Sequence, residues 1–215
     1  MNDSNKQSPF FSIIICTLNR AALLCRALDS LLNQTESDWE AIIIDDGSTD
    51  NTKEIITNYL EQNQNIKYFY HDNHGSGYSK NEGLKLSSGK YVTFLDSDDE
   101  YMPEHLALRK KILLENPSLE LIFGGAKIIG NPYVPDIENQ CKQIHLDNCI
   151  IGGTLFIKRE SAMRIGGIAD MRFGEDYEFY QKALKNNFRI MKTEEQTYVY
   201  HRDGEDSLCD SIIQI

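Results

Sequence analysis

The feature that most constrains the fold of this chain is a regular alternation of short apolar runs with amphipathic segments over residues 11–117. The apolar runs at 11–16, 41–44, 66–70 and 91–95 have the length and the β-branched content of buried strands. The segments between them carry apolar residues on one face at helical spacing. This alternation predicts an α/β domain built from βαβ units, with a mainly parallel sheet and helices on both of its faces.

Acidic residues follow two of these expected strands. Asp45 and Asp46 directly follow the run at 41–44. Three carboxylates lie within residues 96–99, directly after the run at 91–95. The carboxyl ends of parallel strands lie along one edge of a sheet, where open α/β sheets bind ligands, so we expect both groups at that edge. Crowded carboxylates repel each other unless a cation joins them. Taken alone, the carboxylates at 96–99 fit a divalent metal site and a solvated acidic turn equally well.

Composition narrows the class of protein. The chain has 215 residues, of which 40% are hydrophobic and 26% charged, as expected for a globular protein with a full core. Its net charge of −11 argues against a nucleic acid partner. The five cysteines have no paired spacing, which argues against disulfides and structural zinc and favours the cytoplasm. No transmembrane segment or signal peptide is evident, so any membrane association should be peripheral, at the inner face of the membrane.

The second half of the chain is less regular. Residues 119–129, 150–158 and 188–201 are expected to form strands, and residues 174–186 a helix. The polar connection at 130–149 is long enough to be a functional loop.

Three further features carry chemical groups. A glycine-rich segment at 73–83 opens a helix, where glycines and the helix N-terminus favour an anion, and Lys80 lies within its first turns. Glu175 and Asp176 begin the expected helix near residue 174, where the helix dipole alone would explain acids, but a general base is the functional alternative. His201 ends an expected strand, and a lone histidine is more often structural than a ligand.

In their order and spacing these motifs resemble the inverting glycosyltransferases of sequence family 2, which have the GT-A fold. One motif would be weak evidence, whereas six in family order are specific. The resemblance covers roughly residues 10–203 and implies a single Rossmann-like domain. The similar segments are S-I-I-I-C-T-L-N-R at 12–20, I-I-I-D-D-G-S-T-D at 42–50, N-x-G-x-G-x-S-K-N at 73–81, S-G-K-Y-V-T-F-L-D-S-D-D at 88–99, G-G-T-L-F-I-K-R at 152–159 and I-G-G-I-A-D-M-R-F-G-E-D-Y-E-F at 165–179.

The resemblance also implies a division of the chain. It places a nucleotide-binding half at residues 10–117 and an acceptor-binding half at residues 118–203. Residues 1–9 are expected to be a disordered N-terminus, and residues 204–215 a loosely attached tail.

Site residues follow from the same resemblance. Asp46 is expected to receive the uracil N–H of a nucleotide-sugar donor, and Asp98, the second acid of the D-x-D motif, to coordinate Mn²⁺ or Mg²⁺. His201 is a further candidate metal ligand because of its residue type and its place at a strand end, not because of the resemblance. Asp176 is expected to be the catalytic base, supported by Glu175. The remaining donor-binding residues that the resemblance implies are Thr17, Asn19, Arg20, Gly75, Lys80 and Asp96.

Lys80 stands where many members of the family carry arginine, which weakens a bidentate contact to phosphate or base there. The Q-x-x-R-W motif of processive synthases is absent after Asp176, which favours transfer of a single sugar.

The implied activity is metal-dependent, inverting transfer of one hexosyl or hexosaminyl group, with a UDP-sugar favoured as donor. The acceptor would be a hydroxyl of a carbohydrate or a lipid-linked glycan, as in polysaccharide or glycan synthesis. The chemistry agrees with the residues, because a metal at Asp98 would neutralise the leaving diphosphate. Asp176 would take the proton of the attacking hydroxyl.

Other classes fit less well. A calcium-binding EF-hand would need glycine and glutamate where Tyr101 and Ala107 stand. A phosphatase would need its acids after the first strand, which ends in Cys16 and Thr17. A nucleotidyltransferase on a similar fold would need a glycine-rich loop after that strand, and residues 18–24 contain no glycine. It stays open as an alternative, as does a catalytically inactive relative that only binds nucleotide sugars.

Overall fold

The structure is a computed structural model that describes residues 8–137, 139, 141–171 and 173–203. The expected tail at 204–215 and most of the expected N-terminal segment at 1–9 lie outside these residues. The elements of the first half are β1 (Phe11–Thr17), α1 (Ala21–Leu32), β2 (Trp39–Asp45), α2 (Thr52–Gln62), β3 (Ile66–Tyr70), α3 (Ser76–Leu86), β4 (Tyr91–Phe94), β5 (Glu100–Tyr101) and α4 (His105–Glu115). The elements of the second half are β6 (Leu121–Phe123), β7 (Ala126–Gly130), β8 (Tyr133–Pro135), β9 (Gln143–His145), η1 (Leu146–Asn148), η2 (Gly152–Thr154), β10 (Phe156–Lys158), α5 (Arg159–Arg164), α6 (Glu175–Lys185), β11 (Ile190–Lys192) and β12 (Tyr198–Arg202).

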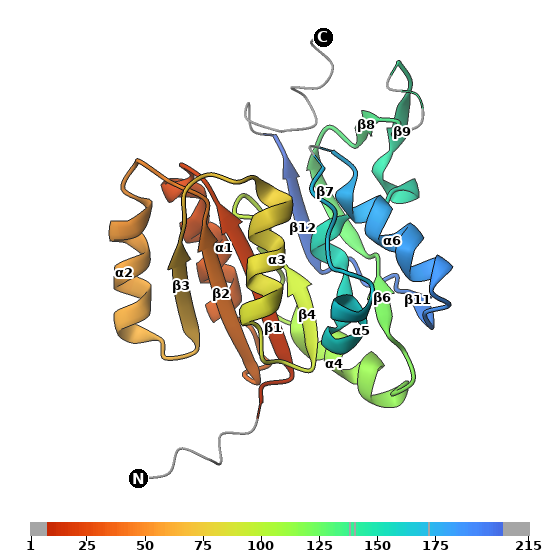
Figure 1. Ribbon diagram of the computed structural model, residues 1–215, viewed down its shortest axis with the longest axis horizontal. Helices are drawn as coiled ribbons and strands as arrows, with labels where there is room; N and C mark the ends of the chain where they lie inside the picture. Colours follow the sequence, from red (N-terminus) through yellow and green to blue (C-terminus); the bar gives the residue numbers. More distant parts are fainter. Residues whose placement is uncertain (1–7, 138, 140, 172, 204–215) are drawn as a thin grey trace.

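A seven-stranded sheet forms the centre of the described part of the chain, in the order β11-β6-β10-β4-β1-β2-β3 (Figure 1). The pairs β1–β2, β1–β4, β2–β3 and β6–β11 are parallel, and β10 runs antiparallel to both of its neighbours. The expected mainly parallel sheet is therefore confirmed. A smaller sheet, in the order β5-β12-β7, and the β8–β9 hairpin complete the architecture.

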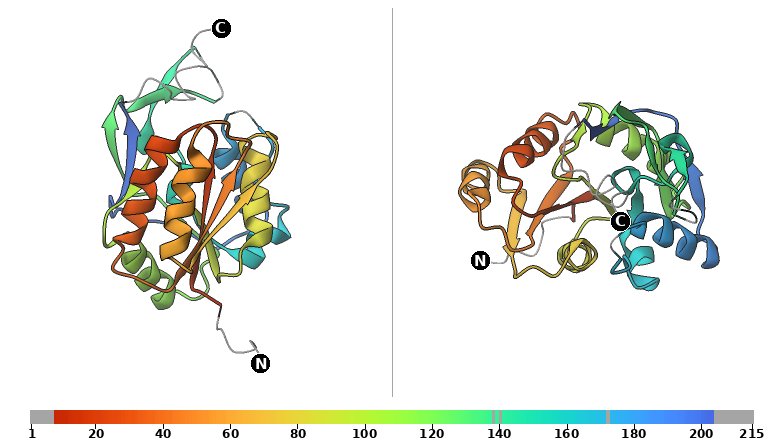
Figure 2. Two further views of the ribbon diagram at one scale, coloured as in Figure 1. Left: turned by 90° about the vertical axis from the view of Figure 1, so that its left-hand side faces the viewer. Right: turned by 90° about the horizontal axis from the view of Figure 1, so that it is seen from above.

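Helices cover both faces of the central sheet (Figure 2). Strand β1 shows why its sequence is a nearly continuous apolar run. Ile13 and Ile15 pack on the side of α1, α2 and α4, whereas Ile14 packs on the side of α3, α5 and α6. Among the described residues, no helix combines the length and apolarity needed to cross a bilayer.

The register of the parallel strands places the acidic groups at one edge of the sheet. Thr17 at the end of β1 pairs with Asp45 at the end of β2, and Ile14 pairs with Phe94 at the end of β4. Asp96 therefore follows β4 at about the level at which β1 ends. The common edge predicted for the two acidic groups is confirmed.

The second half differs from the expected elements. The strand expected at 119–129 is two strands in different sheets, because Gly124 and Gly125 both adopt positive φ, 97° and 76°, and turn the chain between β6 and β7. The strand expected at 188–201 is likewise split into β11 and β12. The polar connection at 130–149 contains the β8–β9 hairpin.

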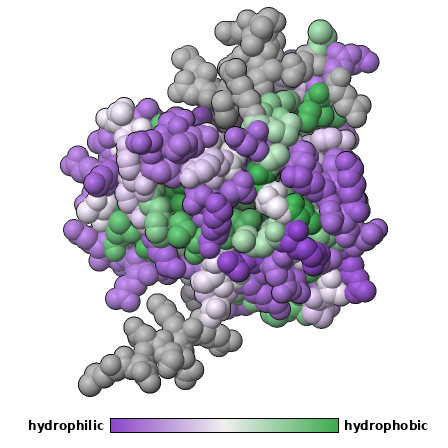
Figure 3. All heavy atoms as spheres, viewed as in Figure 1, coloured by the Kyte–Doolittle hydropathy of each residue, from purple (hydrophilic) through white to green (hydrophobic). Residues whose placement is uncertain are grey.

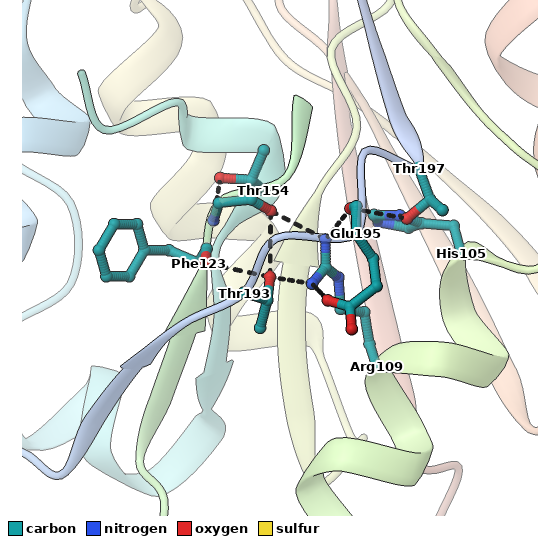
Figure 4. Close-up of polar contacts among 8 residues, drawn as sticks. His105, Arg109, Phe123, Thr154, Thr193, Glu195 and Thr197 are labelled. Atoms are coloured by element: carbon teal, nitrogen blue, oxygen red, sulfur yellow. Dashed lines mark hydrogen bonds and ion pairs between the residues drawn. The ribbon is translucent and has the colours of Figure 1, made fainter. Parts of the chain in front are cut away.

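A buried arginine joins these irregular segments (Figure 4). Arg109 on α4 is 0% exposed, and its Nη2 donates to the carbonyl oxygens of Gly124 (2.8 Å) and Glu195 (3.1 Å). Its Nη1 donates to the hydroxyl of Thr193 and lies 3.7 Å from the Glu195 carboxylate. Burial lowers the pKa of Arg109 to about 10, so the group stays charged at neutral pH. Arg109 thus fixes the β6–β7 turn against the loop that leads into β12.

Candidate active site

A cavity of about 970 Å³ opens where the carboxyl ends of β1, β2 and β4 face the second half of the chain. Every residue predicted for the site lines this cavity except Asn19. The lining residues from the first half, which we call the first-half wall, are mainly polar: Thr17, Arg20, Asp46, Asn73, Ser76, Ser79, Lys80, Asp96, Ser97 and Asp98, with Cys16, Leu18 and Gly75.

The lining residues from the second half, which we call the second-half wall, place a run of apolar side chains beside four acids. Glu175 and Asp176 lie at the start of α6, and Asp136 and Asp170 come from loops. Much of the apolar surface comes from the β8–β9 hairpin and the segment after it: Val134, Pro135, Ile137, Ile144, Leu146, Ile150 and Ile151. Figure 3 shows apolar residues near this hairpin and in the middle of a face that is otherwise mostly hydrophilic.

Asp46 closes the turn that begins α3. Its Oδ1 accepts a hydrogen bond from the backbone N–H of His74 (2.8 Å), and its Oδ2 accepts one from that of Gly75 (2.9 Å). Gly75 adopts a φ of 92°, a conformation that L side chains rarely take. Nδ1 of His71 also lies 3.3 Å from Oδ1, whereas Oδ2 keeps a further lone pair, so Asp46 can still accept a hydrogen bond from a ligand at Oδ2.

The loop after β1 contains three predicted residues, which the structure uses differently. The hydroxyl of Thr17 is buried without a hydrogen-bond partner among the described residues, and it lines the cavity. Asn19, with a φ of 53°, instead accepts a hydrogen bond from the backbone N–H of Thr49 (2.8 Å), while its own N–H donates to Ser48. Asn19 therefore ties two loops together outside the cavity lining. Arg20 reaches across the cavity edge to Asp98.

The acidic group after β4 divides between the cavity and the interior. Asp98 is 28% exposed and its Oδ2 lies 2.5 Å from Nη1 of Arg20. Burial raises the pKa of Asp96, and the charge of Asp98 adds to this effect while Lys80 and Arg20 oppose it. Both carboxylates line the cavity.

Asp99, which the sequence left without a role, points inward. It is 0% exposed, and it accepts hydrogen bonds from the hydroxyl of Tyr198 (2.5 Å) and the backbone N–H of His201 (2.8 Å). The Tyr198 hydroxyl also lies 3.5 Å from Oδ2 of Asp96. Burial, with Asp96 and Asp98 nearby, raises the pKa of Asp99 well above its usual range. Asp99 and Tyr198 thus anchor the D-x-D segment to β12.

The donor set suits a hard divalent cation. Asp96 and Asp98 present carboxylate oxygens to the same cavity, and such oxygens are the ligands that Mg²⁺ and Mn²⁺ prefer. Within the residues that the structure describes, no group of three or more His, Cys, Asp or Glu side chains is arranged to hold a metal. Mg²⁺ is often bound by one or two carboxylates together with substrate phosphates. The two aspartates fit a cation that a nucleotide diphosphate helps to hold.

His201 lines the cavity but already has acidic neighbours. Its Nε2 lies 2.9 Å from Oε1 of Glu100, and its Nδ1 lies 3.4 Å from Oδ1 of Asp203. Nδ1 is buried and has no hydrogen bond among the described residues. The role of His201 as a metal ligand therefore stays a prediction that depends on Nδ1.

Glu175 and Asp176 face the first-half wall from the N-terminus of α6. Oε1 of Glu175 lies 2.9 Å from Nζ of Lys80. Oδ2 of Asp176 accepts a hydrogen bond from the backbone N–H of Gly152 (3.1 Å), and its Oδ1 accepts one from that of Tyr177 (2.7 Å). Two backbone donors thus hold the Asp176 carboxylate in one orientation.

The two neighbouring acids have opposite pKa shifts. Burial raises the pKa of Asp176 to about 6; the adjacent Glu175 carboxylate adds to the rise and Lys80 opposes it. Burial would also raise the pKa of Glu175, but Lys80 holds it below its usual value. At neutral pH both are ionised, and Asp176 has the greater affinity for a proton. This combination suits a general base.

Sequence patterns missed several contacts at this site. They did not indicate that Tyr198 would bind Asp99, that Gly152 would hold Asp176, or that Lys80 would pair with Glu175. The segment Tyr198-Val199-Tyr200-His201, at the end of an expected strand, was the available signal for β12. This segment could not show that its side chains would contact the acidic residues that follow β4.

Comparison with known proteins identifies the family. The sequence model for Glycosyl transferase family 2 matches residues 12–123. The GalNAc(5)-diNAcBac-PP-undecaprenol beta-1,3-glucosyltransferase of Campylobacter jejuni is 39% identical over 122 residues, which cover 56% of this chain and 39% of that protein. A Bacillus subtilis glycosyltransferase named for teichuronic acid biosynthesis is 30% identical over 188 residues, which cover 84% of this chain and 74% of that protein.

The chain spans less than half the length of several relatives, for example 15% of an uncharacterized glycosyltransferase of Rickettsia bellii. The structure of S. aureus TarS 1-349 in complex with UDP is 25% identical with a TM-score of 0.74, covering 89% of this chain and 60% of that one. A mannosyltransferase from Pyrobaculum calidifontis, in complex with GDP-Man and Mn²⁺, is 20% identical with a TM-score of 0.74, covering 93% and 59%. The expected GT-A fold is confirmed, and the chain belongs to glycosyltransferase family 2.

Proposed function

We propose that this domain transfers a single sugar from a nucleotide-sugar donor to an acceptor hydroxyl, with inversion at the anomeric carbon. One observation carries the proposal: Asp176, whose pKa is raised to about 6, faces the same cavity as Asp46, Asp96 and Asp98. A base and a set of donor-binding carboxylates are thus held on opposite walls of one site. Direct displacement needs both, and it inverts the reacting carbon.

The first-half wall would bind the nucleotide. Oδ2 of Asp46 keeps a lone pair for a base N–H. The hydroxyl of Thr17, which has no hydrogen-bond partner among the described residues, gives the cavity a further polar contact. UDP is the first nucleotide to test, because the S. aureus TarS structure contains it. Asp98 and Asp96 would hold Mn²⁺ or Mg²⁺, and the bound cation would supply positive charge against the leaving diphosphate.

The second-half wall would supply the base. The backbone N–H groups of Gly152 and Tyr177 orient the Asp176 carboxylate, which would accept the proton of the acceptor hydroxyl. The acceptor oxygen then forms its bond to the anomeric carbon as the bond to the diphosphate breaks, and the diphosphate leaves with the electron pair. Ionised Asp176 is the reactive form, so the rate should fall as the pH drops through about 6.

The apolar part of the second-half wall favours a lipid-linked glycan as acceptor. The same cavity that holds Asp176 is lined by the apolar side chains of Val134, Pro135, Ile137, Ile144, Leu146, Ile150 and Ile151. The Campylobacter jejuni relative is named for an acceptor linked to undecaprenol. Such an acceptor would bring the domain to the cytoplasmic face of a membrane by peripheral contact. Flotation with vesicles that contain the lipid-linked acceptor would test this part of the proposal.

The activity itself can be tested without knowing the acceptor. UDP-glucose, UDP-GlcNAc and GDP-mannose should be screened by thermal shift with and without Mn²⁺, because a ligand that binds the folded state raises the melting temperature. The donor that stabilises most is then incubated with the protein, and release of its nucleoside diphosphate is measured. We expect Mn²⁺-dependent stabilisation and slow release. Stabilisation without release, with any acceptor tried, would favour an inactive nucleotide-sugar-binding relative.

A further inference from the structure

Lys80 is held inside the site. It lies on α3, its side chain is 10% exposed, and its Nζ lies 2.9 Å from Oε1 of Glu175 at the start of α6. A lysine in a cavity wall usually extends its ammonium group to water. Here the ammonium group instead joins a helix of the first half to a helix of the second half.

Asp176 shares the same corner of the cavity. A Cβ atom placed on Gly152 would lie 3.7 Å from Oδ2 of Asp176 and 4.0 Å from Nζ of Lys80. Because residue 152 is glycine, it places no side chain between the carboxylate and the ammonium group. Lys80 therefore faces both acids of the pair.

The other charges around this corner are mainly negative. Asp96 faces Lys80 and Asp176 from the end of β4, with Asp98 and Arg20 beyond it. The thiol of Cys16 faces Lys80 from β1, and burial raises the pKa of this thiol to about 12, so it carries no charge at neutral pH. Among the described residues at this corner, Lys80 thus provides the positive charge that lies directly against the Glu175 carboxylate.

We propose that Lys80 is a positioning residue for the base: its ammonium group fixes Glu175 at the start of α6 and offsets the negative charge around Asp176. The proposal rests on the proposed function, in which Asp176 accepts the proton. It differs from the role expected from the sequence, in which Lys80 contacts the donor.

The proton affinity of Asp176 can be measured directly, without substrate, by NMR titration of protein labelled with ¹³C at the aspartate carboxyl carbons. Asp176→Asn identifies the signal by its loss. In Lys80→Gln the pKa of Asp176 should rise by about one unit, because a nearby positive charge favours the ionised form. In Glu175→Gln it should fall, because a neighbouring negative charge is removed. Lys80→Arg should restore the wild-type value, and Lys85→Gln, on the exposed side of the same helix, should leave it unchanged.

Binding of UDP with Mn²⁺, measured by calorimetry, distinguishes the two roles of Lys80. A positioning residue predicts a dissociation constant within about threefold of wild type in Lys80→Gln, whereas a residue that pairs with phosphate predicts a loss of about tenfold or more. An unchanged titration of Asp176 in Lys80→Gln would overturn the proposal. If that variant does not fold, an unchanged titration in Glu175→Gln would overturn it instead. A wild-type protein that releases no nucleotide would refute the proposed function and leave the titration result standing.

Discussion

The two walls of the cavity are positioned by different kinds of structure. On the first-half wall, Asp46 and Asp96 follow β2 and β4, and the register of one continuous sheet sets their relative positions. On the second-half wall, Asp176 begins a helix and is held by the N–H of Gly152 in a short 3₁₀ turn. Backbone pairing therefore places the proposed donor-binding groups, whereas contacts between loops and helix ends place the proposed base.

This difference predicts separable effects. A change on the first-half wall should alter the binding of donor and metal, and a change at Asp176 should alter transfer. The network around Arg109 supports the second half, so its loss should disturb that half more than the sheet edge.

The largest expected effect is on transfer in Asp176→Asn. Loss of the base should lower the rate of nucleotide release by about 10³-fold, within the range for general base catalysis. Donor affinity should stay within about threefold of wild type, because Asp46, Asp96 and Asp98 are unchanged. Stopped assays of UDP release and calorimetry measure the two quantities. Transfer at the wild-type rate in Asp176→Asn would show that Asp176 is not the catalytic base.

The next largest effect is on stability, because Arg109 holds segments of the second half of the chain together. Arg109→Met removes the charged hydrogen bonds to the carbonyl oxygens of Gly124 and Glu195 and to the hydroxyl of Thr193, so it should lower the free energy of unfolding by about 3 kcal/mol. Urea denaturation measures this loss. Lys111→Met, an exposed position on the same helix, should change stability by less than about 0.5 kcal/mol. Equal effects of the two substitutions would show that the Arg109 network does not stabilise the fold.

Asp98→Asn is expected to change the free energy of UDP binding by less than Arg109→Met changes the free energy of unfolding. Removing this carboxylate should weaken Mn²⁺-dependent UDP binding by roughly 10- to 100-fold, which is the range for perturbing a metal site. Binding measured with EDTA should be much less affected. The control is Asp147→Asn, an exposed acid that does not line the cavity. Full Mn²⁺ dependence in Asp98→Asn would place the metal elsewhere.

The smallest predicted effect links the pKa of Asp176 to stability. Burial raises that pKa from 3.8 to about 6, so the folded state binds this proton more tightly than the unfolded state. The ionised carboxylate therefore costs stability above pH 6, and the cost disappears as the pH falls to 3.8. The shift alone corresponds to about 3 kcal/mol at pH 8, and the loss of one of the two backbone hydrogen bonds, which an asparagine NH2 group cannot accept, offsets about 2 kcal/mol. Asp176→Asn should therefore be more stable than wild type by about 1 kcal/mol at pH 8, and this gain should be lost at pH 4.5. A gain that is the same at both pH values would contradict the shift.

The difference between the two walls also explains which parts of the fold and of the site the sequence could predict. The strands at 11–16, 41–44 and 91–95 could be predicted because both faces of each are buried, which makes them nearly continuous apolar runs. The strand at 66–70 lies at the edge of the sheet and is largely exposed, so its aromatic content was the signal there. Chain topology then placed Asp46 and Asp96 at one edge. The family motifs identified Asp176 as the expected base.

The rest of the site depends on contacts between residues far apart in the chain. Tyr198 reaches Asp99 across 99 positions, and Lys80 reaches Glu175 across 95. The split of the expected strand at 119–129 required Gly124 and Gly125 to adopt positive φ, which composition permits but does not dictate. Such features are set by tertiary packing, so local patterns could not predict them.

The stereochemistry of the first product tests most directly whether one base at Asp176 acts opposite a donor held by the first-half wall. An α-linked UDP-sugar that the protein binds can be incubated with it, with water as the acceptor, and the released sugar followed by ¹H NMR before its anomers equilibrate. Direct displacement predicts that the β-anomer forms first. Initial formation of the α-anomer would contradict a single displacement with Asp176 as the base.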